Sequence, residues 1–406
     1  MTDSEKDPTP TSIEREKLRH ETGSVEIDED RTNFANARVA GLQTDLKMTN
    51  KQYSIALTVT YVPYIVAELP SNLVLKAVGP NLMLPTMLTL WGIITTLQGA
   101  FSGILAYGIV QMDGVGDRPG WAWIFILEGL FTFLFGLSAY FTLPRSPASA
   151  RFLNEKEKAY VIARLQETGA TGRDKEVDTF SWQEVWQAFT LPQVWFLAVS
   201  FFFDGVLVYG LAYFTPSIVS GLGYINANAQ LFSVPPFAVA FVVTVITSYI
   251  SDRYGCRGYV TIFSGVLATV GFAMFLGVKN VHVKYGSLFL SITGAYCAAP
   301  ALSTWSANNA TPYTRRATAI AIGFIMTNSG GILATWLLGS LSPPPLYTKA
   351  TITLLIFSVL MIVFTAFNIV FLTMQNRKKA QIRATTSREQ EKPGLGDRSA
   401  WFVYTL

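Results

Sequence analysis

The chain has 406 residues, of which 50% are hydrophobic and only 14% are charged, and its mean hydropathy is +0.34. Soluble domains carry about 25% charged residues, so this composition excludes an ordinary soluble protein. The formal net charge of +4 does not indicate a nucleic-acid partner, because the basic residues lie in short stretches between apolar blocks. Two cysteines, Cys256 and Cys297, indicate neither a disulfide framework nor a metal site. The chain carries no motif of an enzyme or of a cofactor site.

The chain begins with a polar region. Residues 1–30 are predicted to form a disordered tail, and residues 31–52 are too polar to cross a membrane. The apolar core of a cleavable signal peptide is not found in this region. We therefore expect the first membrane span to be the apolar block that follows.

About nine apolar blocks come next, most of them near the ~20 residues that cross a bilayer as a helix. They cover residues 53–75, 82–111, 121–143, 193–218, 230–250, 259–278, 285–305, 317–340 and 350–374. The second block is too long for one untilted crossing and too short for two. The pattern predicts an all-α polytopic membrane protein.

Hydrophilic residues separate the third and fourth blocks and follow the last one. Residues 144–192 are predicted to be a linker, in which Asn154 is the N-cap of a soluble helix. The segment SWQEVWQAF in this linker is typical of a short helix on a membrane surface. Residues 376–406 are predicted to be a tail that is basic at first and then disordered. The two membrane regions on either side of the linker are 31–143 and 193–375.

The basic residues predict which ends of the spans face the cytoplasm, because short positively charged loops stay on that side. The linker, loop 251–258, turn 311–316 and the start of the C-terminal tail are all basic, and six spans place them on one side. Only three blocks precede the linker, which would put the N-terminal tail on the opposite side. We infer from this mismatch that the first membrane region is incomplete.

Four polar residues share one face of the first block, at spacings i, i+3, i+7 and i+11: Tyr61, Tyr64, Glu68 and Asn72. A carboxylate in a membrane helix usually faces a cavity or a partner and can take up a proton. Glu68 is therefore the predicted proton-coupling residue of the first half. The alternative is a structural hydrogen bond, or an ion pair with Lys76.

Charged residues also occur within and between the later blocks. Asp204 lies inside the block at 193–218 and is a second candidate for proton coupling. The loop SDRYGCRG contains Asp252, Arg253 and Arg257, which we interpret as a gating clamp between helix ends. The alternative for this loop is a solvated turn that follows the positive-inside rule.

A polar cluster precedes the basic turn, and one amide follows it within a span. Trp305, Asn308 and Asn309 share a helix face, and Asn328 lies in the middle of the next span. Their amides can donate to a carboxylate ligand without carrying charge. The alternative is hydrogen bonding between helices, worth ~0.6–2 kcal/mol per bond. Small residues at every fourth position favour close packing there: Gly331, Thr335 and Gly339.

These segments resemble a known family. The chain is similar to fungal major facilitator transporters of the anion:cation symporter family, the allantoate and nicotinate permease-like group. The resemblance covers residues 31–375 and is carried by RTNFANAR, YVPYIVAELPSNLVLK, LWGIITTLQG, AYGIVQMDGVG, GWAWIFILEGL, SDRYGCRG and NNATPYTRRATAIAIGFIMTNSGGIL. It implies a major facilitator fold, with two pseudo-symmetric helical bundles joined by a cytoplasmic linker.

The resemblance also explains the irregular number of spans. RTNFANAR is similar to the end of the family's first helix, but the apolar body of that helix is absent. LWGIITTLQGA resembles the third helix and runs directly into FSGILAYGIV, which resembles the end of the fifth. The fourth-helix region is therefore missing, and the resemblance implies an incomplete N-terminal bundle with about nine spans in place of twelve.

The resemblance further implies a binding site for a small organic anion. The substrate-facing positions of the family match Arg31, Tyr64, Trp305, Asn308 or Asn309, and Asn328. The arginine and the carboxylates that the family places on its fourth helix have no counterpart in this chain. The part of the site formed by the second half is therefore the better preserved.

We predict a secondary active transporter that couples protons to a small organic anion, such as a carboxylate, a vitamin or an allantoate-like compound, by alternating access. Its expected partners are that anion, protons and the lipid bilayer. We expect a monomer in the plasma membrane, without a cofactor, with both termini cytoplasmic in the family arrangement. The missing helices predict weak or absent transport. The alternatives are a non-transporting membrane sensor or interaction protein, and an inactive product of incorrect splicing.

Overall fold

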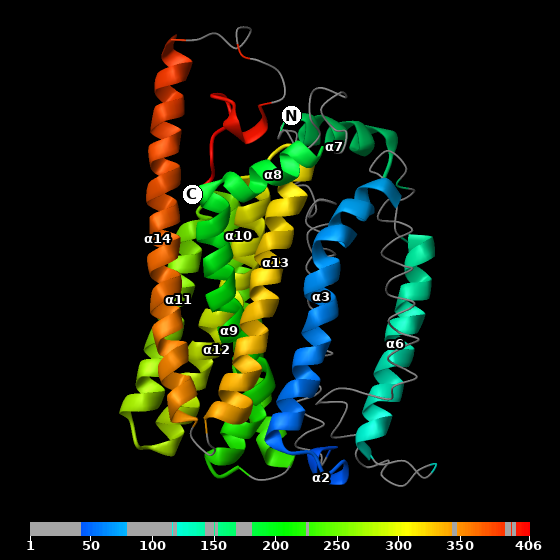
Figure 1. Ribbon diagram of the computed structural model, residues 1–406, viewed down its shortest axis with the longest axis vertical. Helices are drawn as coiled ribbons and strands as arrows, with labels where there is room; N and C mark the ends of the chain where they lie inside the picture. Colours follow the sequence, from blue (N-terminus) through cyan, green and yellow to red (C-terminus); the bar gives the residue numbers. More distant parts are fainter. Residues whose placement is uncertain are drawn as a thin grey trace, which may run out of the picture.

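The computed structural model describes residues 42–78, 116, 120–142, 150, 153–167, 181–224, 227–342, 347–385, 391 and 395–406. Every regular element within these ranges is a helix (Figure 1). Six of the described helices are long and apolar enough to cross a membrane. The predicted all-α membrane fold is therefore confirmed.

The helices follow the predicted spans in order. Before and within the linker lie α2 (Leu42–Asp45), α3 (Asn50–Val78), α6 (Gly120–Thr142), α7 (Glu155–Glu167) and α8 (Trp182–Thr190). After the linker come α9 (Pro192–Gly221), α10 (Ala227–Tyr254), α11 (Arg257–Gly277), α12 (Val281–Asn308), α13 (Tyr313–Trp336), η4 (Leu337–Leu341), α14 (Thr348–Thr385) and η6 (Gly396–Arg398). Each predicted span coincides with one helix, apart from 317–340, which covers most of α13 and of η4, and 82–111, which lies outside the described residues.

The central helix of the second half is α9, which packs against α10, α12, α13 and α14. Its contact with α13 is close because glycines face backbone on both sides. Gly205 lies against the carbonyl of Thr327, and Gly330 lies against the carbonyl of Phe202. A side chain at either position would meet backbone atoms, so these glycines set the spacing of the two helices.

The helices α9 to α14 alternate in direction, so the basic segments collect at one end of the molecule (Figure 1). The connection between α10 and α11 and the start of α13, which packs against α8, lie there, and the last turns of α14 extend beyond them. We call this the basic end. Helix α3 lies beside α13 and runs toward the basic end (Figure 1).

The linker helices are held by local interactions. The Asn154 side chain accepts from the backbone N–H of Glu157 (3.0 Å), whose carboxylate accepts from the backbone N–H of Asn154 (2.9 Å). This reciprocal pair is a capping box, as expected for an N-cap asparagine. In α8, Ala188 is buried while Trp182 and Trp186 are 65% and 70% exposed. The exposed tryptophan face fits a helix that lies on a membrane surface.

The C-terminal region differs from the disordered tail that was expected from residue 376. Helix α14 continues to Thr385, and residues 395–406 lie over the basic end (Figure 1). Asp397 is completely buried and Tyr404 is only 6% exposed. The physical reason is the apolar run WFVY at 401–404, which supplies packing surface within an otherwise polar sequence.

Candidate functional site

Helices α3, α9 and α13 meet through aromatic rings in the half of the molecule that is away from the basic end. The Tyr61 hydroxyl of α3 donates to the Tyr213 hydroxyl of α9 at 2.9 Å, and the Tyr61 ring meets the Tyr209 ring edge-on at 5.5 Å. Gly331 of α13 completes the contact, because a Cβ atom there would lie 2.6 Å from both Tyr61 and Tyr209. The absence of a side chain at Gly331 is therefore what lets α3 and α9 approach α13.

Hydroxyl groups continue this contact toward the start of α3. Ser54 Oγ donates to the Thr335 carbonyl at 3.3 Å and lies 2.9 Å from Ser340 Oγ. The Trp336 indole N–H donates to Thr58 Oγ1 at 2.9 Å. We call Ser54, Thr58 and Tyr61, with their partners in α9, α13 and η4, the hydroxyl gate. It joins α3 of the first half to the second half at the end opposite the basic end.

Two predicted substrate residues lie just beyond the hydroxyl gate on its basic side. Helices α3 and α13 are antiparallel, so Tyr64, one turn from Tyr61, lies near the level of Asn328, one turn from Gly331. Asn328 is 5% exposed, and its Oδ1 has no hydrogen-bond partner among the described residues. A buried polar atom without a partner costs about 1–3 kcal/mol, so Asn328 is a candidate ligand for a bound molecule.

The two predicted proton-coupling carboxylates lie on different helices. Glu68 lies one turn beyond Tyr64 on α3 and is partly exposed. Asp204 of α9 is 1% exposed, and the next residue, Gly205, packs against the Thr327 carbonyl of α13. Asp204 therefore lies inside the second half of the molecule. Arg31 lies outside the described residues.

The predicted gating loop forms a compact ionic cluster at the basic end. Arg257 Nη2 lies 2.7 Å from Asp252 Oδ1, and Arg257 is 7% exposed. With its amide oxygen turned toward the guanidinium, Asn308 accepts from Arg257 Nε at 2.9 Å and Nη2 at 3.2 Å. Arg253 is exposed. The structure thus brings Asp252 and Arg257 together with Asn308 and places Arg253 outside this cluster.

Trp305 and Asn309 also lie at the basic end, where the C-terminal residues contact them. The Trp305 indole N–H donates to the Thr405 carbonyl at 2.8 Å. Asn309 Nδ2 donates to the same carbonyl at 2.9 Å, and Asn309 Oδ1 accepts from the Thr405 N–H at 2.8 Å. Their polar atoms are thus engaged with backbone, on a different level of the molecule from Asn328.

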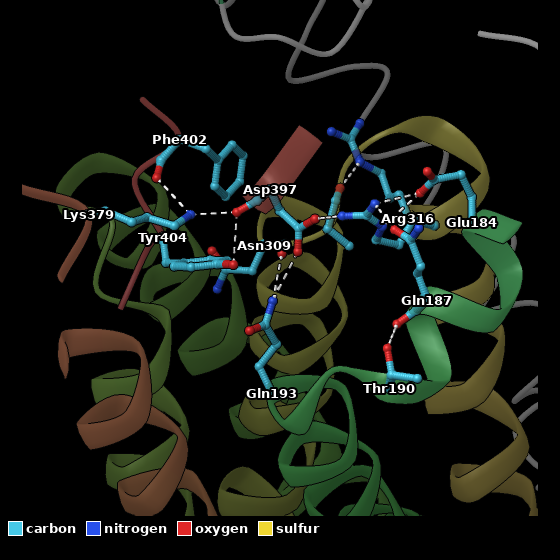
Figure 2. A network of polar contacts seen from close by, with 12 residues as sticks. Glu184, Gln187, Thr190, Gln193, Asn309, Arg316, Lys379, Asp397, Phe402 and Tyr404 are labelled. Carbon is cyan, nitrogen blue, oxygen red and sulfur yellow. Dashed lines mark hydrogen bonds and ion pairs between the residues drawn. The ribbon is translucent and has the colours of Figure 1, made fainter. Parts of the chain in front are cut away.

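A polar network at the basic end includes Glu184, Gln187 and Asp397 (Figure 2), and all three contact one buried arginine. Arg315 of α13 is 1% exposed and pairs with Asp397, which is 0% exposed. Its other nitrogens reach Glu184 of α8, with Nε at 2.8 Å and Nη2 at 2.7 Å, and Gln187 at 2.5 Å. A buried cation is tolerated only when its donors are paired in this way.

Comparison with known proteins assigns the fold to a family. The profile of the Major Facilitator Superfamily matches residues 114–335. An uncharacterised transporter of Schizosaccharomyces pombe (strain 972 / ATCC 24843) is 32% identical over 436 residues, covering 93% of this chain and 86% of the relative. The chain belongs to the major facilitator superfamily. It is an integral, multi-pass membrane protein, and the family predicted from the sequence is confirmed.

Other members of the superfamily are similar over most of their length. The high-affinity nicotinic acid transporter of Saccharomyces cerevisiae (strain ATCC 204508 / S288c) is 26% identical over 407 residues, covering 87% of this chain and 75% of that transporter. The crystal structure of a bacterial homologue of the human lysosomal transporter Spinster has a TM-score of 0.54 at 12% identity, covering 89% of this chain and 97% of that chain. At this identity the similarity shows the fold alone.

The length of one alignment bears on the incomplete N-terminal bundle. The alignment with the Schizosaccharomyces pombe transporter spans 436 residues, which exceeds the 406 residues of this chain. The relative therefore contains residues that have no counterpart within this major facilitator protein. Residues missing from this chain are what the prediction of absent helices requires.

Sequence reasoning missed the partners of Arg315 at the basic end of this transporter. Its ion-pair partners Glu184 and Asp397 are 131 and 82 residues away in the chain, so no spacing pattern connects them. Both occur in hydrophilic segments, where a carboxylate is normally solvated. The one sequence signal was the aromatic run at 401–404, which indicated that the C-terminal residues can pack against a surface.

Proposed function

We propose that this transporter carries out proton-coupled symport of a small organic anion by alternating access. The hydroxyl gate carries the proposal, because it joins α3 to the second half through residues between Asn50 and Tyr61. Alternating access requires two helix groups that close at one end while a central site communicates with the other. Hydroxyl pairs suit such a contact, since each is weak enough to break in every cycle.

The proposal includes the arrangement in the membrane. Two bundles, 31–143 and 193–375, are joined by the linker 144–192, and tails 1–30 and 376–406 flank them. The basic end is proposed to face the cytoplasm. Arginines at the ends of α10, α11 and α13 gather there, and positively charged segments next to spans stay on the cytoplasmic side. We place the protein in the plasma membrane as a monomer, with both termini cytoplasmic in the full-length family arrangement.

The proposed anion site lies between the hydroxyl gate and the basic end. Asn328 is buried there, with an amide oxygen that lacks a partner among the described residues. A protonated carboxyl group can donate to this oxygen, and the amide N–H groups can donate to a carboxylate. Tyr64 adds a hydroxyl from α3, and Arg31 is proposed to supply the charge. The nicotinic acid transporter of Saccharomyces cerevisiae, a relative over 87% of this chain, carries a small aromatic carboxylate by its name.

The proposed coupling residues are the two carboxylates of the spans. Glu68 lies on α3, one turn beyond Tyr64 of the proposed anion site. Because the two residues are neighbours on one helix, the protonation of Glu68 can respond to the occupant of that site. Asp204 is buried beside the glycine contact between α9 and α13. A carboxylate at such a position changes its charge when the surrounding helices move.

Uptake into vesicles tests this function. The purified chain is reconstituted into liposomes with an acidic exterior, and uptake of radiolabelled nicotinate is measured against empty liposomes. We expect saturable uptake that collapses with the proton gradient and is slow, because the fourth-helix region is missing. Glu68→Gln should lose the gradient dependence and retain anion exchange, as expected when proton coupling is removed.

A matched pair on α13 locates the anion site. Asn328→Leu should abolish uptake, whereas Ser329→Ala should retain it, because Ser329 Oγ donates within its own helix to the Ile325 carbonyl at 2.8 Å. Equal loss in both variants would contradict a site at Asn328. An uptake rate that does not depend on the proton gradient would contradict proton coupling.

The second candidate function is a membrane sensor or interaction protein that does not transport. The observation that favours it is the alignment with the Schizosaccharomyces pombe transporter, which at 436 residues is longer than this 406-residue chain, so part of the relative has no counterpart here. A protein of this kind would bind nicotinate without moving it across the vesicle membrane. Equilibrium binding that is lost in Asn328→Leu, with no flux above empty liposomes, would favour this function over symport.

A further inference from the structure

The last twelve residues occupy a built site at the basic end. We call residues 395–406 the C-terminal segment. Its inward-facing residues are buried, with Asp397 at 0%, Ala400 at 6% and Tyr404 at 6% exposure, while Val403 is 54% exposed. Gly396 has φ +58°, and a Cβ there would collide with the Thr311 carbonyl, to which the Asp397 N–H is bonded at 3.1 Å. The segment is therefore shaped to this surface.

Two asparagines pair with consecutive backbone units of the C-terminal segment. Asn309 at the end of α12 donates to the Thr405 carbonyl and accepts from the Thr405 N–H. Asn376 of α14 donates to the Tyr404 carbonyl at 2.8 Å and accepts from the Tyr404 N–H at 2.9 Å. A carboxamide that pairs with both groups of one residue imitates a neighbouring strand, so it recognises an extended peptide by its main chain.

A lysine holds the two ends of the segment together. Lys379 of α14 is 7% exposed and donates to the carbonyls of Asp397 at 2.5 Å and Phe402 at 3.1 Å. Its ammonium also lies 3.9 Å from the centre of the Tyr404 ring, a cation–π contact. The Tyr404 hydroxyl donates to the Asp397 carbonyl at 2.9 Å. Burial raises the pKa of Tyr404 above its usual value near 10, so this donor stays protonated.

The side-chain anchor of the segment is the Asp397 carboxylate. It pairs with Arg315 and accepts from Gln193 Nε2 at 3.3 Å (Figure 2). The same guanidinium binds Glu184 and Gln187 of α8 through its other nitrogens. One buried cation is thus shared by the C-terminal segment and the linker helix, and each partner keeps it oriented for the other.

We propose that the basic end is a binding site for an extended peptide, that its ligand is the chain's own C-terminal segment, and that occupancy of this site holds the linker helix α8 in place. When the segment leaves, Arg315 loses one carboxylate and the cover that excludes water, and solvent screening then weakens its contact with Glu184. The linker connects the two halves of the chain, so the segment controls how firmly α8 is attached to the second half. This goes beyond transport and does not depend on the substrate.

Two pairs of spin labels on the full-length protein test the proposal, after Cys256 and Cys297 have been replaced by alanine. One pair, Val403→Cys with Tyr259→Cys, reports the C-terminal segment, and the other, Trp186→Cys with Tyr259→Cys, reports α8. All three labelled side chains are exposed, at 54%, 55% and 70% for Val403, Tyr259 and Trp186. Double electron–electron resonance spectroscopy should give one narrow distance distribution for each labelled pair when no further substitution is present.

Adjacent lysines provide the matched variants. Lys379→Met should broaden the segment distribution and, through the coupling, shift α8 toward a released population by roughly tenfold, the middle of the range for contacting charge networks. Lys378→Met should change neither, because Lys378 is exposed. Asn376→Leu removes only the backbone pairing and should act like Lys379→Met, which separates release of the segment from misfolding around a buried charge.

Two outcomes would overturn the proposal. A broad segment distribution in the parent protein would show that the site is not occupied by these residues. Release of the segment in both Lys379→Met and Asn376→Leu with α8 unmoved would show that the linker is held independently of it.

Discussion

Tyr61 and Tyr213 share a hydrogen bond of 2.9 Å between their hydroxyl groups, although 152 residues separate them in the chain. Tyr61 is completely buried and Tyr213 is 2% exposed. The bond connects the helix α3 of the first half to the central helix α9 of the second. It is therefore a direct probe of how the two halves close against each other in a transport cycle.

Removing one hydroxyl of this pair should loosen the hydroxyl gate. Tyr61→Phe leaves the Tyr213 hydroxyl buried without this partner, which costs about 1 kcal/mol and corresponds to a several-fold shift toward the open gate. The labelling rate of Leu57→Cys, which replaces a fully buried residue of α3, by a membrane-impermeant thiol reagent should rise accordingly. The exposed Tyr259→Phe serves as control, and equal labelling rates in both variants would contradict a gating role for Tyr61.

A methyl group at Gly331 should separate α3 from α13. The Cβ of Gly331→Ala would lie 2.6 Å from the rings of Tyr61 and Tyr209, and overpacking of this kind typically costs 1–3 kcal/mol. Thermal unfolding in detergent should show a lower midpoint. Gly286→Ala is the matched change in α12, where the new Cβ has open space around it, and it should be neutral or raise the midpoint because alanine favours a helix.

Arg315 should contribute more to stability than its neighbour Arg316. Arg315→Met leaves the carboxylates of Asp397 and Glu184 without their buried cation, which costs about 3–5 kcal/mol. Arg316→Met removes a bond to the Ala310 carbonyl at 3.0 Å and should cost about 1 kcal/mol. Thermal unfolding distinguishes the two. Stability should partly recover when Arg315→Met is combined with Asp397→Asn and Glu184→Gln, and no recovery would argue against charge pairing as the cause.

The two arginines of the gating loop should differ in their effect on uptake. Arg257 is 7% exposed and lies 2.7 Å from Asp252, so Arg257→Gln should change the rate of nicotinate uptake several-fold by removing a contact between helix ends. Arg253→Gln changes an exposed side chain and should leave the rate within twofold, as for a solvated surface charge. Similar rates in the two variants would favour the solvated-turn interpretation of this loop.

Much of the fold could be predicted because the bilayer imposes it on local sequence. A stretch of about 20 apolar residues must form a helix to satisfy its backbone hydrogen bonds, so α9 to α14 coincide with the predicted spans. The N-cap at Asn154 was predictable because capping is a local interaction, and its partner Glu157 lies three residues away. The proximity of Asp252 and Arg257 could be predicted because only five positions separate them, at the end of α10 and the start of α11, and the gating role of this loop stays a prediction.

The sequence by itself determined the class of the protein, the positions of its spans, the basic character of one end and the polar residues Glu68, Asp204 and Asn328 within the spans. Tertiary structure alone decided which of these residues meet. Trp305, Asn309 and Asn328 had the same appearance in the sequence, yet the first two bind Thr405 at the basic end while Asn328 lies near the hydroxyl gate. Contacts between residues 96 or 152 positions apart depend on how helices pack, and no local pattern of hydrophobicity or charge encodes that packing.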